Sequence, residues 1–240
     1  MKAKPIKKAL FNWSGGKDSA FALWKILQQK EYFISTLLTA VNKKYDRISM
    51  HGVRSQLLRQ QAASLGLPLE ILSIPEQPTM EAYDKLMADK LQSLKQRNIR
   101  FSVFGDIFLE DLKQYREQRL KEVGMKAVFP VWKMPTPEVV SQFIENGFKA
   151  VVVSANARLL DKSFAGRLID RSFLKDLPEG VDPCGENGEF HSFVFDGPIF
   201  RNPVPFKTGE TVLKEYKTAG KWDSAFWYCD LIPVEKQDYK

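Results

Sequence analysis

Residues 10–20 read Leu-Phe-Asn-Trp-Ser-Gly-Gly-Lys-Asp-Ser-Ala. The mostly apolar run 9–13 is typical of a buried parallel strand. Two glycines follow, and then a helical pattern begins. Its apolar face is formed by Ala20, Leu23, Trp24 and Leu27. A strand, a tight turn and a helix leave free N–H groups and the positive end of the helix dipole at the turn, where they attract an anion.

The turn carries the groups that a phosphate-binding loop needs. Lys17 supplies a positive charge, and Ser14 and Ser19 supply hydroxyls. The common phosphate loop has a glycine five residues before its Gly-Lys pair and a Ser or Thr after the lysine, but Phe11 and Asp18 stand there. A carboxylate repels phosphates unless a divalent cation lies between them, so Asp18 suggests a metal ion or a role away from the anion. The structural alternative is a glycine-rich turn that merely starts an ordinary helix.

Length and composition set the broad class. The chain of 240 residues is long enough for one large domain or two small ones, and 44% hydrophobic and 27% charged residues are ordinary for a globular protein. Neither a membrane span nor a signal peptide is visible, so we expect a cytoplasmic protein with no membrane association. Cys184 and Cys229 do not form a short-spaced pair, which argues against a zinc ribbon or a redox pair.

The net charge is +7 and the pI about 9.2. Such a balance favours polyanionic partners, including nucleotides and RNA. A solvated, slightly basic exterior explains the charge equally well, and no aromatic-rich motif supports RNA binding.

Strand and helix patterns alternate through the first half of the chain. We expect strands at 9–13, 34–41, 69–74, 101–104 and 127–132, and helices after the first at 54–65, 79–97 and 110–123. This alternation predicts an α/β fold with a parallel sheet and right-handed crossovers. Ligands of such sheets lie beyond the carboxyl ends of the strands. The loops after Trp13, Val41 and Phe104 therefore share one rim, across which a ligand bound by its phosphates at the first loop can lie.

A composition change near Met134-Pro135-Thr136-Pro137 predicts a domain boundary. We expect one domain over residues 1–133, which contains the phosphate-binding turn, and a smaller α+β domain over 134–240. Thr136 is a plausible N-cap, with Pro137 at the first position of a helix that stops at Gly147. A strand at 148–153 and a short helix at 170–177 should follow.

A second motif, Gly-Glu-Asn-Gly-Glu-Phe-His-Ser, occupies residues 185–192 and precedes an apolar strand. Two carboxylates in one tight loop repel each other, so the pattern favours a cation site or a proton acceptor. The alternative is a hairpin turn with solvated acids and a histidine on a strand face.

Ser-Gly-Gly-Lys-Asp-Ser at 14–19 resembles the pyrophosphate loop of the ATP pyrophosphatases, the adenine nucleotide alpha-hydrolase superfamily. With Met-His-Gly-Val-Arg at 50–54, Gly-Asp-Ile at 105–107 and the motif at 185–191, the chain resembles the diphthine–ammonia ligase family as far as about Phe200. The resemblance implies a Rossmann-like nucleotide alpha-hydrolase domain and an ATP-dependent amide ligase. In that reaction a carboxylate attacks the α-phosphate, pyrophosphate leaves, and ammonia displaces AMP. The family's named reaction amidates diphthine on elongation factor 2.

The resemblance also implies roles for the two domains and for individual residues. The domain over 1–133 would bind ATP, and the domain over 134–240 would be a substrate or catalytic domain. Lys17, Glu186 and Glu189 would be catalytic, the glutamates by positioning ammonia or taking its proton. Asp18 would help to seat Mg²⁺. The nucleotide-binding set would be Ser14, Gly15, Gly16, Lys17, Asp18, Ser19, His51, Arg54, Gly105 and Asp106.

The family pattern continues with Tyr-Glu-Thr after the second Gly-Glu, whereas this chain has Phe190-His191-Ser192. The variant resembles a bacterial branch, and bacteria lack diphthamide. The acceptor therefore stays open between a small-molecule carboxylate and a protein such as a translation factor. No glutaminase module is visible, so free ammonia or another amine is the expected nucleophile. The oligomeric state is open, with a homodimer among the options.

Two other functions remain under consideration. The first is a tRNA-modifying adenylase of the same superfamily, which would activate a base carbonyl. The second is a non-catalytic ATP sensor, which would bind nucleotide tightly without releasing pyrophosphate.

Overall fold

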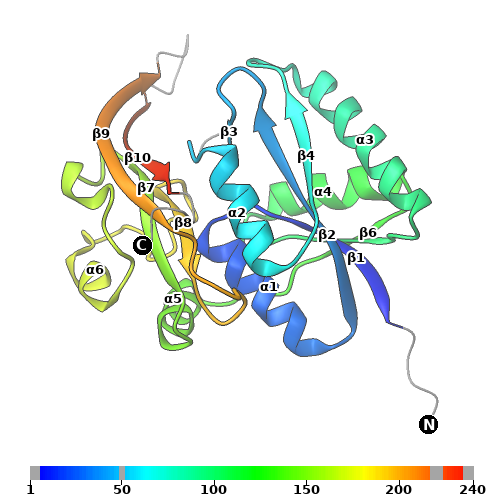
Figure 1. Ribbon diagram of the computed structural model, residues 1–240, viewed down its shortest axis with the longest axis horizontal. Coiled ribbons are helices and arrows are strands. Elements are labelled where there is room, and N and C mark those ends of the chain that lie inside the picture. The colour runs from blue at the N-terminus through cyan, green and yellow to red at the C-terminus, as the bar shows by residue number, and fades with distance from the viewer. Residues whose placement is uncertain (1–5, 49–51, 217–223, 235–240) are drawn as a thin grey trace.

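The computed structural model describes residues 6–48, 52–216 and 224–234 (Figure 1). Its first sheet contains the parallel strands β1 (Lys7–Asn12), β2 (Tyr32–Asn42), β4 (Leu69–Ile74), β5 (Phe101–Val103) and β6 (Lys126–Val128). Their spatial order is β4-β2-β1-β5-β6, and the two-residue strand β3 (Arg47–Ile48) pairs antiparallel with the end of β2. The chain thus winds outward from β1 in both directions, which confirms the predicted Rossmann-like α/β fold.

Helices cover both faces of this sheet. α1 (Lys17–Gln29) and α2 (Ser55–Leu65) lie between the parallel sheet and the rest of the chain, whereas α3 (Met80–Gln96) and α4 (Glu110–Glu122) lie on the opposite face (Figure 1). The buried residues of α3 and α4 form a core of their own with Leu10 and Leu38. None of the helices in the described parts of the chain is long and apolar enough to cross a bilayer.

The helices expected at 54–65 and 79–97 are present, and each has an identifiable cap. Gly66 ends α2 with a left-handed φ of 68°, and the Thr79 hydroxyl accepts a hydrogen bond of 3.1 Å from the Ala82 N–H at the start of α3. Two predictions are wrong. The strand expected at 127–132 ends at Val128, because Pro130 cannot donate to a ladder and residues 130–132 form a turn. Thr136 does not cap its helix, because its hydroxyl donates to Asp182 at 2.6 Å.

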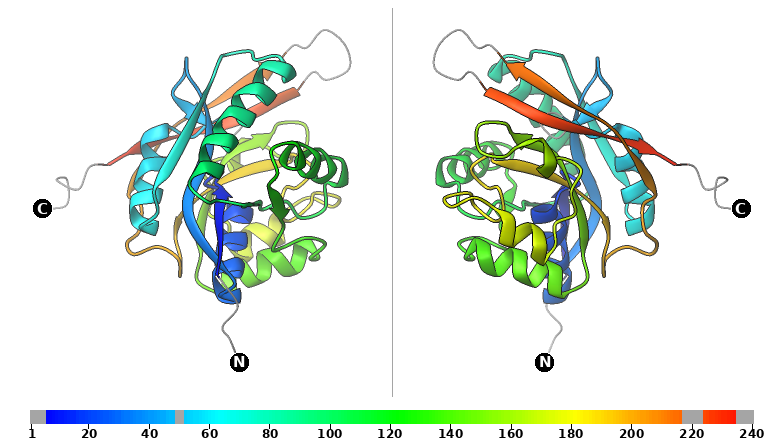
Figure 2. Two further views of the ribbon diagram at one scale, coloured as in Figure 1. Left: turned by 90° about the vertical axis from the view of Figure 1, so that its right-hand side faces the viewer. Right: turned by 90° about the vertical axis from the view of Figure 1, so that its left-hand side faces the viewer.

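The second half of the chain builds an antiparallel sheet with two helices. Its strands are β7 (Lys149–Asn156), β8 (Phe190–Asp196), β9 (Phe206–Tyr216) and β10 (Ser224–Pro233), in the order β8-β7-β10-β9. α5 (Thr136–Glu145) precedes β7, and a 3₁₀ turn (Lys162–Phe164) and α6 (Arg171–Asp176) lie between β7 and β8. Figure 2 shows β9 and β10 as a long pair that crosses the top of the molecule.

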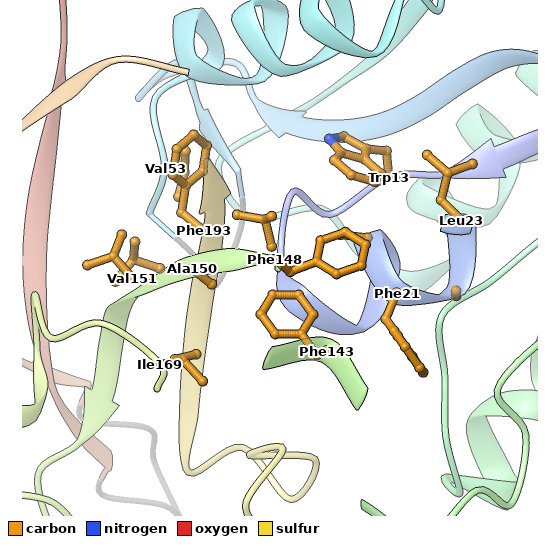
Figure 3. Packing of buried hydrophobic residues seen from close by; sticks show 14 of the residues in the cluster. Trp13, Phe21, Leu23, Val53, Phe143, Phe148, Ala150, Val151, Ile169 and Phe193 are labelled. Carbon is orange, nitrogen blue, oxygen red and sulfur yellow. The ribbon is translucent and has the colours of Figure 1, made fainter. Parts of the chain in front are cut away.

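One hydrophobic core joins the two halves. It runs from β1, α1 and α2 to α5, β7 and β8. The Phe143 and Phe148 rings stack with centroids 4.8 Å apart, and Figure 3 shows them beside Phe21 of α1. The helix that begins at the Gly15-Gly16 turn is therefore held against the second sheet by apolar contact.

Candidate functional site

A cavity of about 880 Å³ opens beyond the carboxyl ends of β1, β2 and β5. Its walls are the turn after β1, the facing sides of α3 and α4, and the loop at 185–192 from the second half of the chain. The cavity lies at the switch point between β1 and β5, where doubly wound sheets bind their ligands, and its size suits a nucleotide-sized molecule.

The turn after β1 presents its backbone and hydroxyls to this cavity. Gly15 has a left-handed φ of 78°, a conformation that favours glycine. The Ser14 hydroxyl donates to Ser19 Oγ at 3.1 Å and accepts from the Gly16 N–H at 3.3 Å, and the Ser19 hydroxyl donates to the Gly16 carbonyl at 3.1 Å. Ser14, Gly16, Lys17, Asp18 and Ser19 line the cavity, but Gly15 does not.

Lys17 is the first residue of α1, and its side chain is almost fully buried, with 3% exposed. Its ammonium group donates to both Asp18 carboxylate oxygens at 2.8 Å and to the Cys184 carbonyl, and it lies 5.5 Å from the centre of the Phe190 ring. Burial acts to lower the pKa of Lys17, but the charge and hydrogen bond of Asp18, together with Cys184 and the Glu186 charge, outweigh it, and the pKa is raised. Lys17 is therefore a fixed positive charge that touches both halves of the chain.

The loop after β5 closes on the start of α1. A Cβ at Gly105 would lie 2.9 Å from Ser19 Cα, so only glycine permits this approach. Asp106 forms an ion pair with Arg116 of α4, with the Arg116 Nη2 and Nε atoms 3.1 and 3.0 Å from its oxygens. Burial raises the pKa of Asp106, and the Arg116 charge opposes that rise.

Glu186 reaches the cavity from the second half of the chain. Its carboxylate accepts a hydrogen bond of 3.0 Å from the Ile107 N–H, two residues after Gly105. Burial, together with the nearby Asp18 charge, raises the pKa of Glu186 to about 7. A carboxyl group with this pKa can exchange a proton near neutral pH.

Glu189 is placed differently, and it does not line the cavity. It is 3% exposed, and its carboxylate accepts from the backbone N–H groups of Asp182 and Asn187 at 3.1 and 2.9 Å and from the Asn187 side chain at 3.1 Å. The Asp182 carboxylate in turn accepts from the N–H groups of Cys184 and Glu186 at 2.7 and 3.4 Å. The carboxylates of Asp182 and Glu189 thus hold, through hydrogen bonds to backbone N–H groups, the loop in which Glu186 lies.

Arg54 lies away from the cavity lining and pairs with Asp230 of β10. Its Nη2 atom is 2.5 Å from one Asp230 oxygen, and Arg47 Nη1 is 2.8 Å from the other. The structure thus places Arg54 where the two sheets meet. His51 lies outside the described residues.

The cavity contains one group that sequence reasoning missed, Arg116, and one that it noticed only within a motif, His191. Arg116 of α4 lines it, with its guanidinium 4.4 Å from the Phe104 ring. His191 also lines it, and burial lowers the pKa of His191 to about 4. The position of Arg116 on a strongly charged helix gave no local signal that distinguishes it from a solvated arginine. His191 was visible only as part of the second motif.

The residues of the cavity can be compared with the ligands that a magnesium ion takes. Among the described residues, no set of three side chains is gathered as a metal site. Asp18 lies on the cavity wall, 27% exposed, and Mg²⁺ is commonly held by one or two carboxylates together with substrate phosphates. The residues therefore fit a magnesium ion that arrives with phosphates rather than one held by the protein alone.

Family models and known proteins match this chain over most of its length. Residues 7–127 match the family model described as the diphthamide synthase N-terminal domain, and residues 136–232 match the diphthamide synthase C-terminal domain. The human diphthine–ammonia ligase is 22% identical over 221 residues, covering 83% of this chain and 83% of the human protein. The Danio rerio diphthine–ammonia ligase is 24% identical over 220 residues, covering 83% of this chain and 86% of that protein.

Among solved structures, a predicted subunit of a tRNA methyltransferase from Methanocaldococcus jannaschii is similar with a TM-score of 0.42 and 15% identity. It covers 61% of this chain and 80% of the other, a likeness too distant to bear on function.

Proposed function

The chain belongs to the diphthamide synthase family, and from this premise we propose that it is an ATP-dependent acid–ammonia ligase. It adenylates a carboxylate with release of pyrophosphate and then amidates it with ammonia. One observation carries the proposal. An anion-binding turn with a buried lysine and a carboxyl group with a pKa of about 7 face the same cavity from two different halves of the chain.

The first step uses the turn at 14–19. A carboxylate oxygen of the acceptor attacks the α-phosphorus of ATP, the bond to the β-phosphate breaks, and pyrophosphate leaves with its electrons. The amino end of α1 and the Lys17 ammonium stabilise the negative charge that develops there. Asp18 would hold a magnesium ion, which neutralises part of the phosphate charge. Asp106 keeps Arg116 beside the cavity as a second positive charge.

The second step uses Glu186. The ammonia nitrogen attacks the acyl carbon, and the carbon–oxygen bond to AMP breaks. Glu186 takes the proton that the nitrogen loses, because its pKa of about 7 matches neutral conditions. Glu189 touches no cavity surface, so we assign it the role of positioning the loop that carries Glu186.

The acceptor is a carboxylate of a small molecule or of a protein such as a translation factor. The test is an incubation of the protein with ATP, Mg²⁺, ¹⁵N-ammonium and cell extract, separated afterwards into protein, tRNA and small-molecule fractions. The proposal expects one species to gain a ¹⁵N-amide, detected by mass spectrometry, as AMP appears. Adenylation of tRNA would favour the tRNA-modifying alternative. ATP binding with no AMP formed in any fraction would favour the sensor.

A further inference from the structure

Gln61 lies in the middle of α2 and is completely buried, with 0% exposed. Its side-chain amide bonds three separate groups. The Oε1 atom accepts from the Trp13 indole N–H at 2.9 Å, and the Nε2 atom donates to the carbonyls of Gly15 at 3.0 Å and Val194 at 2.6 Å. Trp13 and Gly15 flank Ser14 in the turn at 14–19 (the phosphate turn), and Val194 belongs to β8.

The Gly15 carbonyl is held from two sides. It accepts one hydrogen bond from Gln61 and a second from the backbone N–H of Val194 at 2.9 Å. Both donors lie away from the cavity, which is lined by Ser14 and Gly16 but not by Gly15. Fixing this carbonyl fixes the plane of the Gly15–Gly16 peptide to which it belongs. The direction of the Gly16 N–H, which donates to the Ser14 hydroxyl at 3.3 Å, is fixed with it.

Only an amide satisfies the three partners together. The indole N–H needs an acceptor and the two carbonyls need donors, so neither a carboxylate nor an apolar side chain of this size can replace Gln61. The contact is also close, because a Cβ at Gly15 would lie 2.7 Å from Gln61 Oε1.

We propose that Gln61 is a positioning residue that holds the phosphate turn in its anion-binding conformation and links that conformation to the docking of β8. β8 also carries Ser192, whose hydroxyl accepts from the Lys17 N–H at 3.1 Å. The second sheet thus supports the turn at both Gly15 and Lys17. This inference rests on the proposed function, because it takes the turn to be the site of the ATP phosphates.

The test compares Gln61→Met with wild type and with Gln56→Met, a control on the exposed face of the same helix. Binding of the non-cleavable analogue α,β-methylene-ATP is measured by calorimetry at a temperature at which circular dichroism shows all three proteins folded. Loss of these hydrogen bonds should weaken analogue binding by about tenfold, while Gln56→Met binds as wild type does. Equal affinity in Gln61→Met and wild type, with only a lowered melting temperature in the variant, would overturn the positioning role.

If Gln61→Met does not fold, Gln61→Glu provides a second test of the positioning role. A neutral glutamic acid can donate to one carbonyl and accept from Trp13, whereas a charged carboxylate faces two carbonyl oxygens. The affinity of Gln61→Glu for the analogue, divided by that of wild type at the same pH, should therefore increase as the pH falls. A ratio that does not change with pH would contradict the inference. Wild-type protein that binds no analogue would instead refute the proposed function, so the two failures are distinguishable.

Discussion

The backbone N–H of Lys17 donates a hydrogen bond of 3.1 Å to the hydroxyl of Ser192, 175 residues later in the chain. One of the N–H groups at the start of α1 is thus satisfied by β8 of the second sheet. Both residues are buried, with 3% and 4% exposed, so water does not easily replace this contact. The anion-binding turn is a joint product of the two halves of the chain.

Ser192→Ala should lower the free energy of unfolding by about 1 kcal/mol, because it leaves a buried N–H group without its partner. Urea denaturation measures the change. Ser93→Ala, on the exposed face of α3, is the matched control and should have little effect. Equal stability of the two variants would show that the Ser192 contact contributes nothing.

Glu186→Gln should slow AMP formation by about 100-fold or more if Glu186 is the proton acceptor, while the KM for ATP stays near that of wild type. The wild-type rate should rise as the pH increases through about 7, because burial and Asp18 place the pKa of Glu186 there. The variant should lose this rise. Initial rates from pH 5.5 to 8.5, with an acceptor-containing extract fraction, provide the measurement. Glu179→Gln, at an exposed position, is the control, and an unchanged pH profile in Glu186→Gln would exclude the assigned role.

Glu189→Gln tests a different property, the stability of the loop. An amide in place of the carboxylate directs an NH₂ group at N–H donors, so the free energy of unfolding should fall by about 2 kcal/mol. Chemical denaturation measures the fall, with Glu179→Gln again as the control. A variant of wild-type stability with abolished catalysis would return Glu189 to the direct catalytic role that the sequence suggested.

His191 should make stability depend on pH between about 6.5 and 4. Burial lowers the pKa of His191 in the folded protein to about 4, whereas an unfolded histidine titrates near its ordinary value. Between these values the unfolded chain binds the extra proton, so the free energy of unfolding falls as the pH falls, by at most about 1.4 kcal/mol per pH unit. His191→Gln should remove this part of the slope. Parallel stability curves for wild type and variant would contradict the prediction.

Local signals predicted most of the fold. The run at 9–20 and the apolar periodicity of the helices expected at 54–65 and 79–97 act through neighbours in sequence, and the structure has helices there. Lys17 and Glu186, which belong to the two sequence motifs, both line the cavity, and their catalytic roles stay predictions. What sequence reasoning missed depends on contacts between distant residues. The interaction of Gln61 with Val194 and the pairing of Arg54 with Asp230 join residues 133 and 176 positions apart.

Glu189 illustrates the same limit at short range. The sequence places its carboxylate three residues from that of Glu186, and nothing local shows which of the two faces the cavity. The direction is decided by the fold of the loop, in which Asp182 and Asn187 direct their N–H groups at Glu189. The carboxylate that remains, Glu186, points to Ile107 and the cavity.

In the proposed reaction, ATP is cleaved between its α- and β-phosphates at the turn that contains Lys17. The most direct measurement is chromatography of the nucleotide products formed with ATP, Mg²⁺, ammonium and an acceptor-containing extract fraction, for wild type, Lys17→Ala and the control Lys25→Ala on the same helix. We expect AMP and pyrophosphate in equal amounts for wild type and Lys25→Ala, and neither product for Lys17→Ala. Formation of ADP and phosphate, or undiminished AMP formation by Lys17→Ala, would contradict the proposed reaction.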